Sequence, residues 1–309
     1  MEKTLQQLFD EYADQIKFSG GLSDETVRGY RNVFNLFLQI MPEVSTLDSL
    51  TPAMLNEFFK RISTRQRIIG RDTLKTGVKP STIKTQNSKL NVFFVWLCKK
   101  NYIAENPLKD IKPPRVTYDD FRRLEDSDVN KIYSAITLHS DNSFILRRDT
   151  LIVSLLSFCG LRKGEFISLK VTDIDMEKKE ITIRGETSKS KRPRTLKMHP
   201  TLVLHLKDYF KARNDLGLKT EWLIATKNGD RGLSREGLKH WVQSLNKKSG
   251  VKFHLHMFRH TFACKLAEAN TNVFKIQKLM GHTDIKMTMK YTRSMRTEDM
   301  GEDIAKISF

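Results

Sequence analysis

The sequence has little cysteine, no long apolar run and no loop of the kinds that bind nucleotides. Its three cysteines, Cys98, Cys159 and Cys264, lack metal-ligand spacing and lie in apolar, helical contexts, so we expect reduced core residues. The longest apolar run, residues 151–159, is too short to span a bilayer, and the acidic, amphipathic N-terminus is not typical of a signal peptide. No Walker-type or GxGxxG loop, nucleophile elbow or acidic metal cluster is present. These absences argue against a disulfide-rich or membrane-spanning protein and indicate a cytoplasmic one.

Positive charge is what the sequence has in excess. Its 309 residues include 54 Lys and Arg against 36 Asp and Glu, which gives a net charge of +18 and a pI near 9.7. A surplus this large favours a polyanionic partner, with a solvated basic surface as the alternative. Charge alone does not separate DNA from RNA or a membrane surface. The length is sufficient for two domains with their own cores.

Helical periodicity dominates the first third of the chain. Apolar residues recur at helical spacing, and Ser23 and Thr51-Pro52 are typical helix starts, which predicts a small bundle of four or five helices. The polar, basic residues 64–79 are predicted to form a loop. The Pro113-Pro114 pair disfavours helix and suits an extended linker. We therefore predict domains over residues 1–112 and 125–309, joined by a linker over 113–124.

The second domain is predicted to be α-rich with one small sheet. Helical patterns cover residues 126–136, 147–159, 200–213 and 235–246, and residues 173–175, 181–184 and 194–198 alternate like short strands. Strands this close in the sequence favour a three-stranded antiparallel sheet. The predicted fold class is mainly α, and a parallel α/β architecture is not expected.

Four polar residues stand out near the C-terminus. His256 and Arg259 are three apart in a helical segment, so their side chains leave the same face. His282 follows a glycine, and Tyr291 comes after a further short helical run. A nucleophilic tyrosine needs nearby cations to help it lose its proton, and this set would supply them around a phosphate. The alternative for Tyr291 is a half-buried core residue.

Two earlier segments carry cations of the same kind. Arg162 lies just past the helix-closing Gly160, and a turn of helix would bring the carboxylate of Glu165 to its guanidinium, as a fork ready for a phosphate. Lys189 lies at the tip of a predicted hairpin, from which it could protonate a leaving-group oxygen. Lys191 is a close competitor. The alternative for Arg162 and Glu165 is an ordinary surface ion pair, and the alternative for Lys189 is a solvated lysine in a turn.

The histidines do not have the pattern of a metal site. His256 and His260 are four apart, but Met257 stands where the HExxH motif has glutamate. Carboxylates at ligand spacing are missing, and Arg259 within the cluster would repel a divalent ion. We expect no metal and no cofactor.

Together these segments resemble the tyrosine recombinases, the phage-integrase and Xer family. SFCGLRKGEFISLKVTDID resembles the family's first arginine box, TSKSKRPRTLKMHP its β-hairpin lysine segment, HMFRHTFA its HxxRH box and LMGHTDIKMTMKY its LGH…T…Y box. The N-terminal bundle and the ENPLKDIKPP linker resemble its SAM-like core-binding domain. Four motifs in the expected order, over nearly the whole chain, make the resemblance specific.

The resemblance implies a site-specific DNA recombinase that cleaves and rejoins DNA without ATP or metal. Tyr291 would attack the scissile phosphate, leaving a 3′-phosphotyrosine bond and a free 5′-hydroxyl. Arg162 and Arg259 would hold the non-bridging oxygens, and Glu165 would orient Arg162. A 5′-hydroxyl from a second strand would then reverse the step and complete strand exchange.

The remaining roles follow from the same motifs. Lys189 would protonate the leaving 5′-oxygen; because the family's usual glycine-lysine-glycine turn is absent, Lys191 stays open as the alternative. His256 would assist proton transfer at the tyrosine, and His282 would hydrogen-bond the phosphate. We also expect phosphate contacts, with a solvated basic face as the alternative, from Lys84, Lys89, Lys191 and Arg192.

The resemblance also implies partners. These are double-stranded DNA recombination sites, each bound by a dimer and joined in a homotetramer, with room for an accessory directionality factor and no membrane. The protein would be cytoplasmic and nucleoid-associated. We expect the segment after Tyr291 to dock on a neighbouring catalytic domain, and the arm-site domain of lambda-type integrases to be missing. The alternative function is that of a type IB topoisomerase, which relaxes DNA as a monomer.

Overall fold

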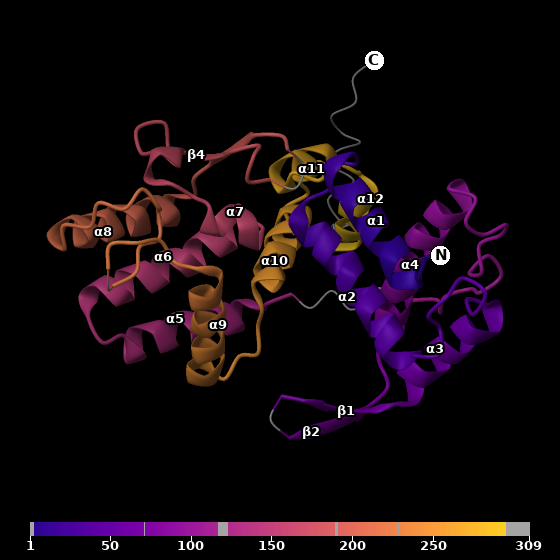
Figure 1. Ribbon diagram of the computed structural model, residues 1–309. Helices are drawn as coiled ribbons and strands as arrows, with labels where there is room; N and C mark the ends of the chain where they lie inside the picture. The colour runs from indigo at the N-terminus through magenta and orange to yellow at the C-terminus, as the bar shows by residue number, and fades with distance from the viewer. Residues whose placement is uncertain (1–2, 71, 117–122, 189–190, 228, 295–309) are drawn as a thin grey trace, which may run out of the picture. The chain divides into compact units, whose positions relative to one another are not determined.

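The computed structural model describes residues 3–70, 72–116, 123–188, 191–227 and 229–294. They form two compact units, Met1–Asp119 and Asp120–Phe309, each with its own hydrophobic core (Figure 1). Part of the predicted linker, residues 117–122, and the predicted docking tail, residues 295–309, lie outside the described residues. The predicted domain limits stay a prediction.

The first unit is helical, with a hairpin between its last two helices. Its elements are α1 Leu5–Phe18, α2 Asp24–Ile40, α3 Pro52–Thr64, β1 Gln66–Ile69, β2 Thr73–Thr76 and α4 Pro80–Lys99. The first three helices begin where a side-chain oxygen of Thr4, Ser23 or Thr51 accepts a backbone N–H bond. Aromatic side chains fill the core, where Phe9 stacks on Phe34 with ring centroids 3.9 Å apart.

The hairpin β1–β2 shows that one sequence prediction was wrong. Residues 64–79 do not form a loop throughout, because β1 and β2 pair antiparallel from Gln66↔Thr76 to Ile69↔Thr73. Every side chain of β2 is exposed. A strand whose side chains are all exposed, as in β2, has no buried face to impose an alternation of apolar and polar residues. The signal by which a strand is recognised was therefore absent.

The second unit packs its helices around α6. Its helices are α5 Asp126–His139, α6 Ser143–Cys159, α7 Lys163–Ile167, α8 Pro200–Asp215, α9 Arg235–Ser249, α10 Leu255–Glu268, α11 Val273–Met280 and α12 Lys286–Met289, with the 3-10 helices η1 Val171–Asp173 and η2 Lys290–Ser294. The six residues from Leu151 to Leu156 are all buried, and α6 contacts both α8 and α10. Cys159 and Cys264 are buried free thiols, and Cys98 is partly buried.

The small sheet lies between α7 and α8 in the sequence. Its strands are β3 Ile174–Asp175, β4 Glu180–Ile183 and β5 Arg194–Lys197. They pair antiparallel in the order β3-β4-β5, with Ile181 facing Ile174 on one side and Leu196 on the other. The predicted mainly α class, with a helical N-terminal part and a three-stranded antiparallel sheet, is confirmed. Within the described ranges, no helix is both long and apolar enough to cross a membrane.

Candidate active site

The first cationic residue of the site is placed by a sharp end to α6. Gly160 adopts the left-handed conformation at φ +55°, and a β-carbon there would lie 2.3 Å from a ring carbon of Phe262. The chain then turns, and Arg162 becomes the residue that precedes α7. Its side chain thereby lies over the start of that helix, three residues before Glu165.

Glu165 is the anionic centre of a buried network. Its carboxylate accepts hydrogen bonds from the backbone N–H of Arg162 at 3.0 Å and from Arg162 Nη1 at 2.9 Å. Arg194, at the start of β5, donates through Nη1 at 3.0 Å and Nη2 at 2.8 Å. Glu165 is 2% exposed. Burial alone would raise its pKa, but the bonds and charge of Arg194, followed by the bonds of Arg162, outweigh it and hold the pKa at about 2. The group is a carboxylate at neutral pH.

Arg259, on α10, is the second buried guanidinium of the site. It is 2% exposed and donates to the backbone carbonyls of Gly160 at 2.6 Å and Met280 at 2.5 Å. Burial and then the charge of Arg162 lower the pKa of Arg259 to about 9, so it remains protonated at neutral pH. Its two bonds tie the end of α6 to the end of α11.

Gly281 ends α11 at a point where the backbone passes close to the arginines. Its carbonyl accepts a bond of 2.8 Å from Arg162 Nη2. Its φ is +62°, and a β-carbon there would lie 3.0 Å from Arg194 Nη1 and 3.4 Å from Arg162 Nη1. Both the conformation and the space therefore favour glycine here.

The network carries excess positive charge. Arg162, Arg194 and Arg259 contribute three positive charges and Glu165 one negative charge, so this set has a net charge of +2. Backbone carbonyls stabilise the guanidinium groups without neutralising them. A partly desolvated site of this kind suits an anion with one charge in its ground state and more in its transition state.

Two of the predicted histidines lie beside the arginines. His282, directly after Gly281, is 9% exposed, and its Nδ1 lies 2.8 Å from Thr288 Oγ1. Burial, then the charges of Arg259 and Arg162, lower the pKa of His282 to about 3. His256, one turn before Arg259 on α10, has a pKa lowered by partial desolvation and next by the charge of Arg259. Both rings are neutral at physiological pH.

Tyr291 lies in η2 with its hydroxyl directed at α10. It is 2% exposed, and its Oη lies 2.7 Å from His260 Nδ1. The ring packs in a small apolar cluster with residues of α10 and α11, and it runs nearly parallel to the His282 ring, at 10° and with centroids 6.5 Å apart. Burial raises the pKa of Tyr291, and the charge of Arg259 offsets part of that rise. In this arrangement the tyrosine is neutral.

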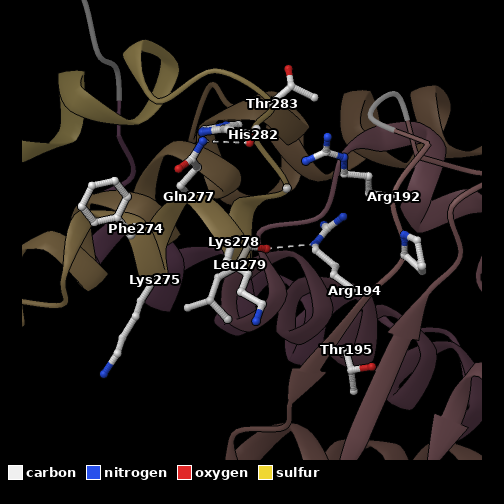
Figure 2. A pocket seen from close by; sticks show the side chains of 12 residues that line it. Arg192, Arg194, Thr195, Phe274, Lys275, Gln277, Lys278, Leu279, His282 and Thr283 are labelled. Carbon is white, nitrogen blue, oxygen red and sulfur yellow. Dashed lines mark hydrogen bonds between the residues drawn. The ribbon is translucent and has the colours of Figure 1, made fainter.

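A cavity of about 630 Å³ adjoins the site. Figure 2 shows Arg192 and Arg194 on the β5 side and side chains of α11 on the other, with His282 at the same opening. Arg194 Nε donates to the Leu279 carbonyl at 2.9 Å, the bond dashed in Figure 2. The cavity is therefore basic, and through Arg194 and Gly281 in its wall it borders the network around Glu165.

The predicted residues divide into three groups. The six that the second unit brings together are Arg162, Glu165, His256, Arg259, His282 and Tyr291. Lys189 lies outside the described residues, whereas Lys191 and Arg192 are exposed beside β5. Lys84 and Lys89 lie on α4 of the first unit, where both are partly buried. Lys89 Nζ donates to the Gly29 carbonyl at 3.0 Å, a structural bond that the sequence did not reveal.

Sequence reasoning missed three residues of the site. The sequence indicates only a strand at Arg194, although its alternation with the buried Leu196 places it on the inner face of β5. For His260 the sequence suggests only a metal ligand, yet this residue follows Arg259 and lies one turn after His256. Lys290, whose Nζ lies 4.9 Å from the Tyr291 ring centroid, gave no signal beyond its neighbour. Across the described residues, no group of three or more His, Cys, Asp or Glu could hold a metal ion.

Comparison with protein-family models gives two matches that together cover most of the chain. The phage integrase family matches residues 122–298, more than half of the chain, and the phage integrase N-terminal SAM-like domain matches residues 9–101. Among curated proteins, the chain is 25% identical over 292 residues to tyrosine recombinase XerC of Psychromonas ingrahamii, covering 93% of this chain and 92% of that protein. It is 26% identical over 293 residues to a tyrosine recombinase of Thermosipho africanus, covering 94% and 95%.

Solved structures share the fold at lower identity. The Tn1549 transposon integrase in complex with a circular intermediate DNA superposes with a TM-score of 0.76 at 21% identity, covering 97% of this chain and 99% of that one. The XerH site-specific recombinase bound to its difH substrate gives 0.68 at 19% identity, covering 98% and 84%. At these identities the likeness concerns the fold.

Proposed function

The chain belongs to the phage integrase family of tyrosine recombinases, and from this premise we propose that it is a site-specific DNA recombinase acting through a 3′-phosphotyrosine intermediate. The observation that carries the proposal is the set of the partly buried Arg162 with the buried Glu165 and Arg259, beside the hydroxyl of Tyr291. That hydroxyl lies 2.7 Å from His260, which follows Arg259 on α10. The solved relatives named above are described in complexes with DNA, which supports DNA as the polyanion that the charge of +18 favours.

The arginines would act on the phosphate. Arg162 and Arg259 bind its two non-bridging oxygens, where negative charge grows as the attacking oxygen approaches phosphorus. Glu165 keeps Arg162 in place from behind and, with Arg194, forms the rigid base of the site. Removing one donor of this kind from a preorganised site slows a reaction by about 10²–10³-fold.

The bonds and protons balance without a cofactor. Tyr291 Oη forms a bond to phosphorus, the bond from phosphorus to the 5′-oxygen breaks, and the 5′-oxygen takes a proton from Lys189 or Lys191. The tyrosine proton would pass to the neutral imidazole of His256, and His282 would donate a hydrogen bond to the phosphate. The phosphotyrosine keeps the energy of the phosphodiester, so a 5′-hydroxyl from another strand can reverse the step.

The assembly and the cellular setting are part of the same proposal. Each site would bind two protomers, and two sites would meet in a tetramer, with the tail after Tyr291 docked on a neighbouring protomer. Phosphate contacts would come from Lys84, Lys89, Lys191 and Arg192. An accessory protein would determine the direction of recombination. The protein would be cytoplasmic and associated with the nucleoid.

A covalent-trapping experiment tests this function. DNA bound by the protein is selected from a random pool, and the selected duplex is nicked beside each phosphodiester in turn, so that the short cleaved strand diffuses away. We expect the wild-type protein to form a protein–DNA adduct at one position that survives denaturation. Tyr291→Phe removes only the hydroxyl and should form none. An equal adduct with phenylalanine at position 291 would refute the nucleophile assignment.

The topoisomerase alternative has its own assay. A recombinase should act only on plasmids that carry the selected site. Relaxation of any supercoiled plasmid, by a protein that remains monomeric on DNA, would instead favour the type IB activity.

A further inference from the structure

The hydrogen-bond partner of the Tyr291 hydroxyl is a side chain to which neither the motifs nor the proposed chemistry gives a role. Tyr291 Oη lies 2.7 Å from His260 Nδ1, and the two ring centroids are 5.7 Å apart at an angle of 51°. A tyrosine that is 2% exposed has its hydroxyl away from bulk water, so its orientation follows the polar groups that the protein provides. His260 is one such group.

His260 lies next to a residue that is bonded to the ends of two helices. It follows Arg259 on α10, and Arg259 is tied to the ends of α6 and α11 by its bonds to Gly160 and Met280. Tyr291, by contrast, lies in the 3-10 helix η2, which follows the four-residue helix α12. Elements this short have few internal hydrogen bonds and depend on tertiary contacts for their geometry. The bond to His260 therefore fixes the position of the Tyr291 hydroxyl relative to α10, the helix that carries Arg259.

The protonation states agree with His260 as an acceptor. Burial comes first, followed by the charges of His256, Lys290, His254 and Arg259, and together they lower the pKa of His260 to about 3. A neutral imidazole in the tautomer that carries its proton on Nε2 accepts a hydrogen bond from a hydroxyl at Nδ1. So weak a base is poorly suited to remove a proton from a tyrosine whose own pKa is raised. Geometry and basicity together favour orientation over proton transfer.

We propose that His260 is a positioning residue for the recombination reaction, and that its Nδ1 aims the Tyr291 hydroxyl at the phosphate held by Arg259 and Arg162. The inference rests on the proposed function, because it takes Tyr291 as the nucleophile. His260 contacts the attacking oxygen in the resting site.

Two substitutions separate this role from the alternatives. His260→Ala removes the acceptor, whereas His260→Asn keeps an oxygen, Oδ1, close to where Nδ1 lies, but cannot take up a proton at neutral pH. The matched control is His240→Ala, which removes an exposed histidine from α9. Each variant is assayed as the full chain on the nicked duplex described above, in single turnover at saturating DNA, beside its DNA affinity and its melting temperature.

We expect His260→Ala to lower the rate of adduct formation about tenfold, the factor for loss of about one net hydrogen bond, with DNA affinity unchanged within about twofold. His260→Asn should restore the rate to within about threefold of wild type, and His240→Ala should match wild type. An unchanged or faster His260→Ala would overturn the proposal, because the bond would then be irrelevant or would restrain the tyrosine. A His260→Asn as slow as the alanine variant would also overturn it, in favour of proton transfer or packing.

The two levels of inference fail differently. If the wild-type protein forms no adduct, or if Tyr291→Phe forms one, the proposed function is wrong. If the adduct depends on Tyr291 but not on the acceptor at position 260, only the positioning role is wrong.

Discussion

Replacing Glu165 by glutamine should destabilise the second unit by several kcal/mol at neutral pH. The substitution keeps the size of the side chain and removes the one negative charge that Arg162 and Arg194 share. Breaking a buried pair from one side typically costs about 3–5 kcal/mol, because the remaining charge is left without its partner. Glu165 and Arg194 are 2% and 9% exposed, so solvent screens little of this loss.

The pH dependence gives a second, independent magnitude. The pKa of Glu165 falls from 4.5 to about 2 on folding, and each pH unit corresponds to 1.36 kcal/mol, so the ionised group contributes about 3 kcal/mol of stability. Because the folded pKa is the lower one, this contribution is fully present above pH 4.5 and is lost as the pH falls toward 2. The variant has no carboxylate at this position, so its free energy of unfolding should lack this loss as the pH falls from 4.5 toward 2.

The assay must report the second unit alone, since a chain with two compact units need not unfold in one step. A urea titration in which the hydrogen exchange of peptides from α6 and α10 is measured at each urea concentration reports the unfolding of the second unit alone. Glu177→Gln, at an exposed glutamate, is the matched control and should change the free energy of unfolding by less than about 0.5 kcal/mol. A loss below about 1 kcal/mol for Glu165→Gln at pH 7, or equal losses of stability in variant and wild type between pH 5 and pH 3, would refute the reasoning.

Three further predictions concern the site and its DNA. Gly281→Ala should lower the stability of the second unit by about 1–3 kcal/mol in urea titrations and slow adduct formation, because φ +62° and the 3.0 Å approach to Arg194 both disfavour a β-carbon. Arg259→Lys should slow single-turnover adduct formation by about 10²-fold or more while retaining DNA affinity. An ammonium cannot reproduce the planar fork that bonds the Met280 carbonyl and, in the proposed reaction, would bond a phosphate oxygen at the same time. Affinity for DNA, measured by fluorescence anisotropy, should fall steeply with salt, and Lys84→Gln should make the slope of log K against log salt shallower by about one if that lysine contacts a phosphate. Equal slopes would place Lys84 away from the DNA.

The same network shows how three guanidinium groups are accommodated close together. Glu165 offsets one of three guanidinium charges, and the backbone carbonyls at Gly160, Met280 and Gly281 accept hydrogen bonds from two of them. These carbonyls belong to the ends of α6 and α11, whose final peptide groups lack helical partners. Helix ends and arginines thus satisfy each other and hold the site in place before DNA arrives.

Local chemistry made part of this protein predictable from its sequence. Helix starts at Ser23 and Thr51, the stop at Gly160 and the alternation of β4 and β5 depend on neighbours a few residues away, and these are the elements that the predictions located. The contact between Arg162 and Glu165 is of the same kind, because one turn of helix brings residues three apart together. The order of four motifs then indicated the family, which the family models confirm.

Only the tertiary structure decided the contacts between residues far apart in the chain. Arg194 bonds Glu165, which is 29 residues away in the sequence, and Tyr291 contacts His260, which is 31 residues away. Neither separation corresponds to a helical or strand period, so no sequence pattern indicates these contacts. The sequence did not predict the hairpin β1–β2, because every side chain of β2 is exposed and the strand therefore has no alternation of apolar and polar residues. The phosphate contact of Lys89 stays a prediction, and only the structure shows that its Nζ also bonds the Gly29 carbonyl of α2. The sequence shows directly the interactions between residues that are close along the chain. Contacts between residues far apart in the chain depend on how the helices and strands pack.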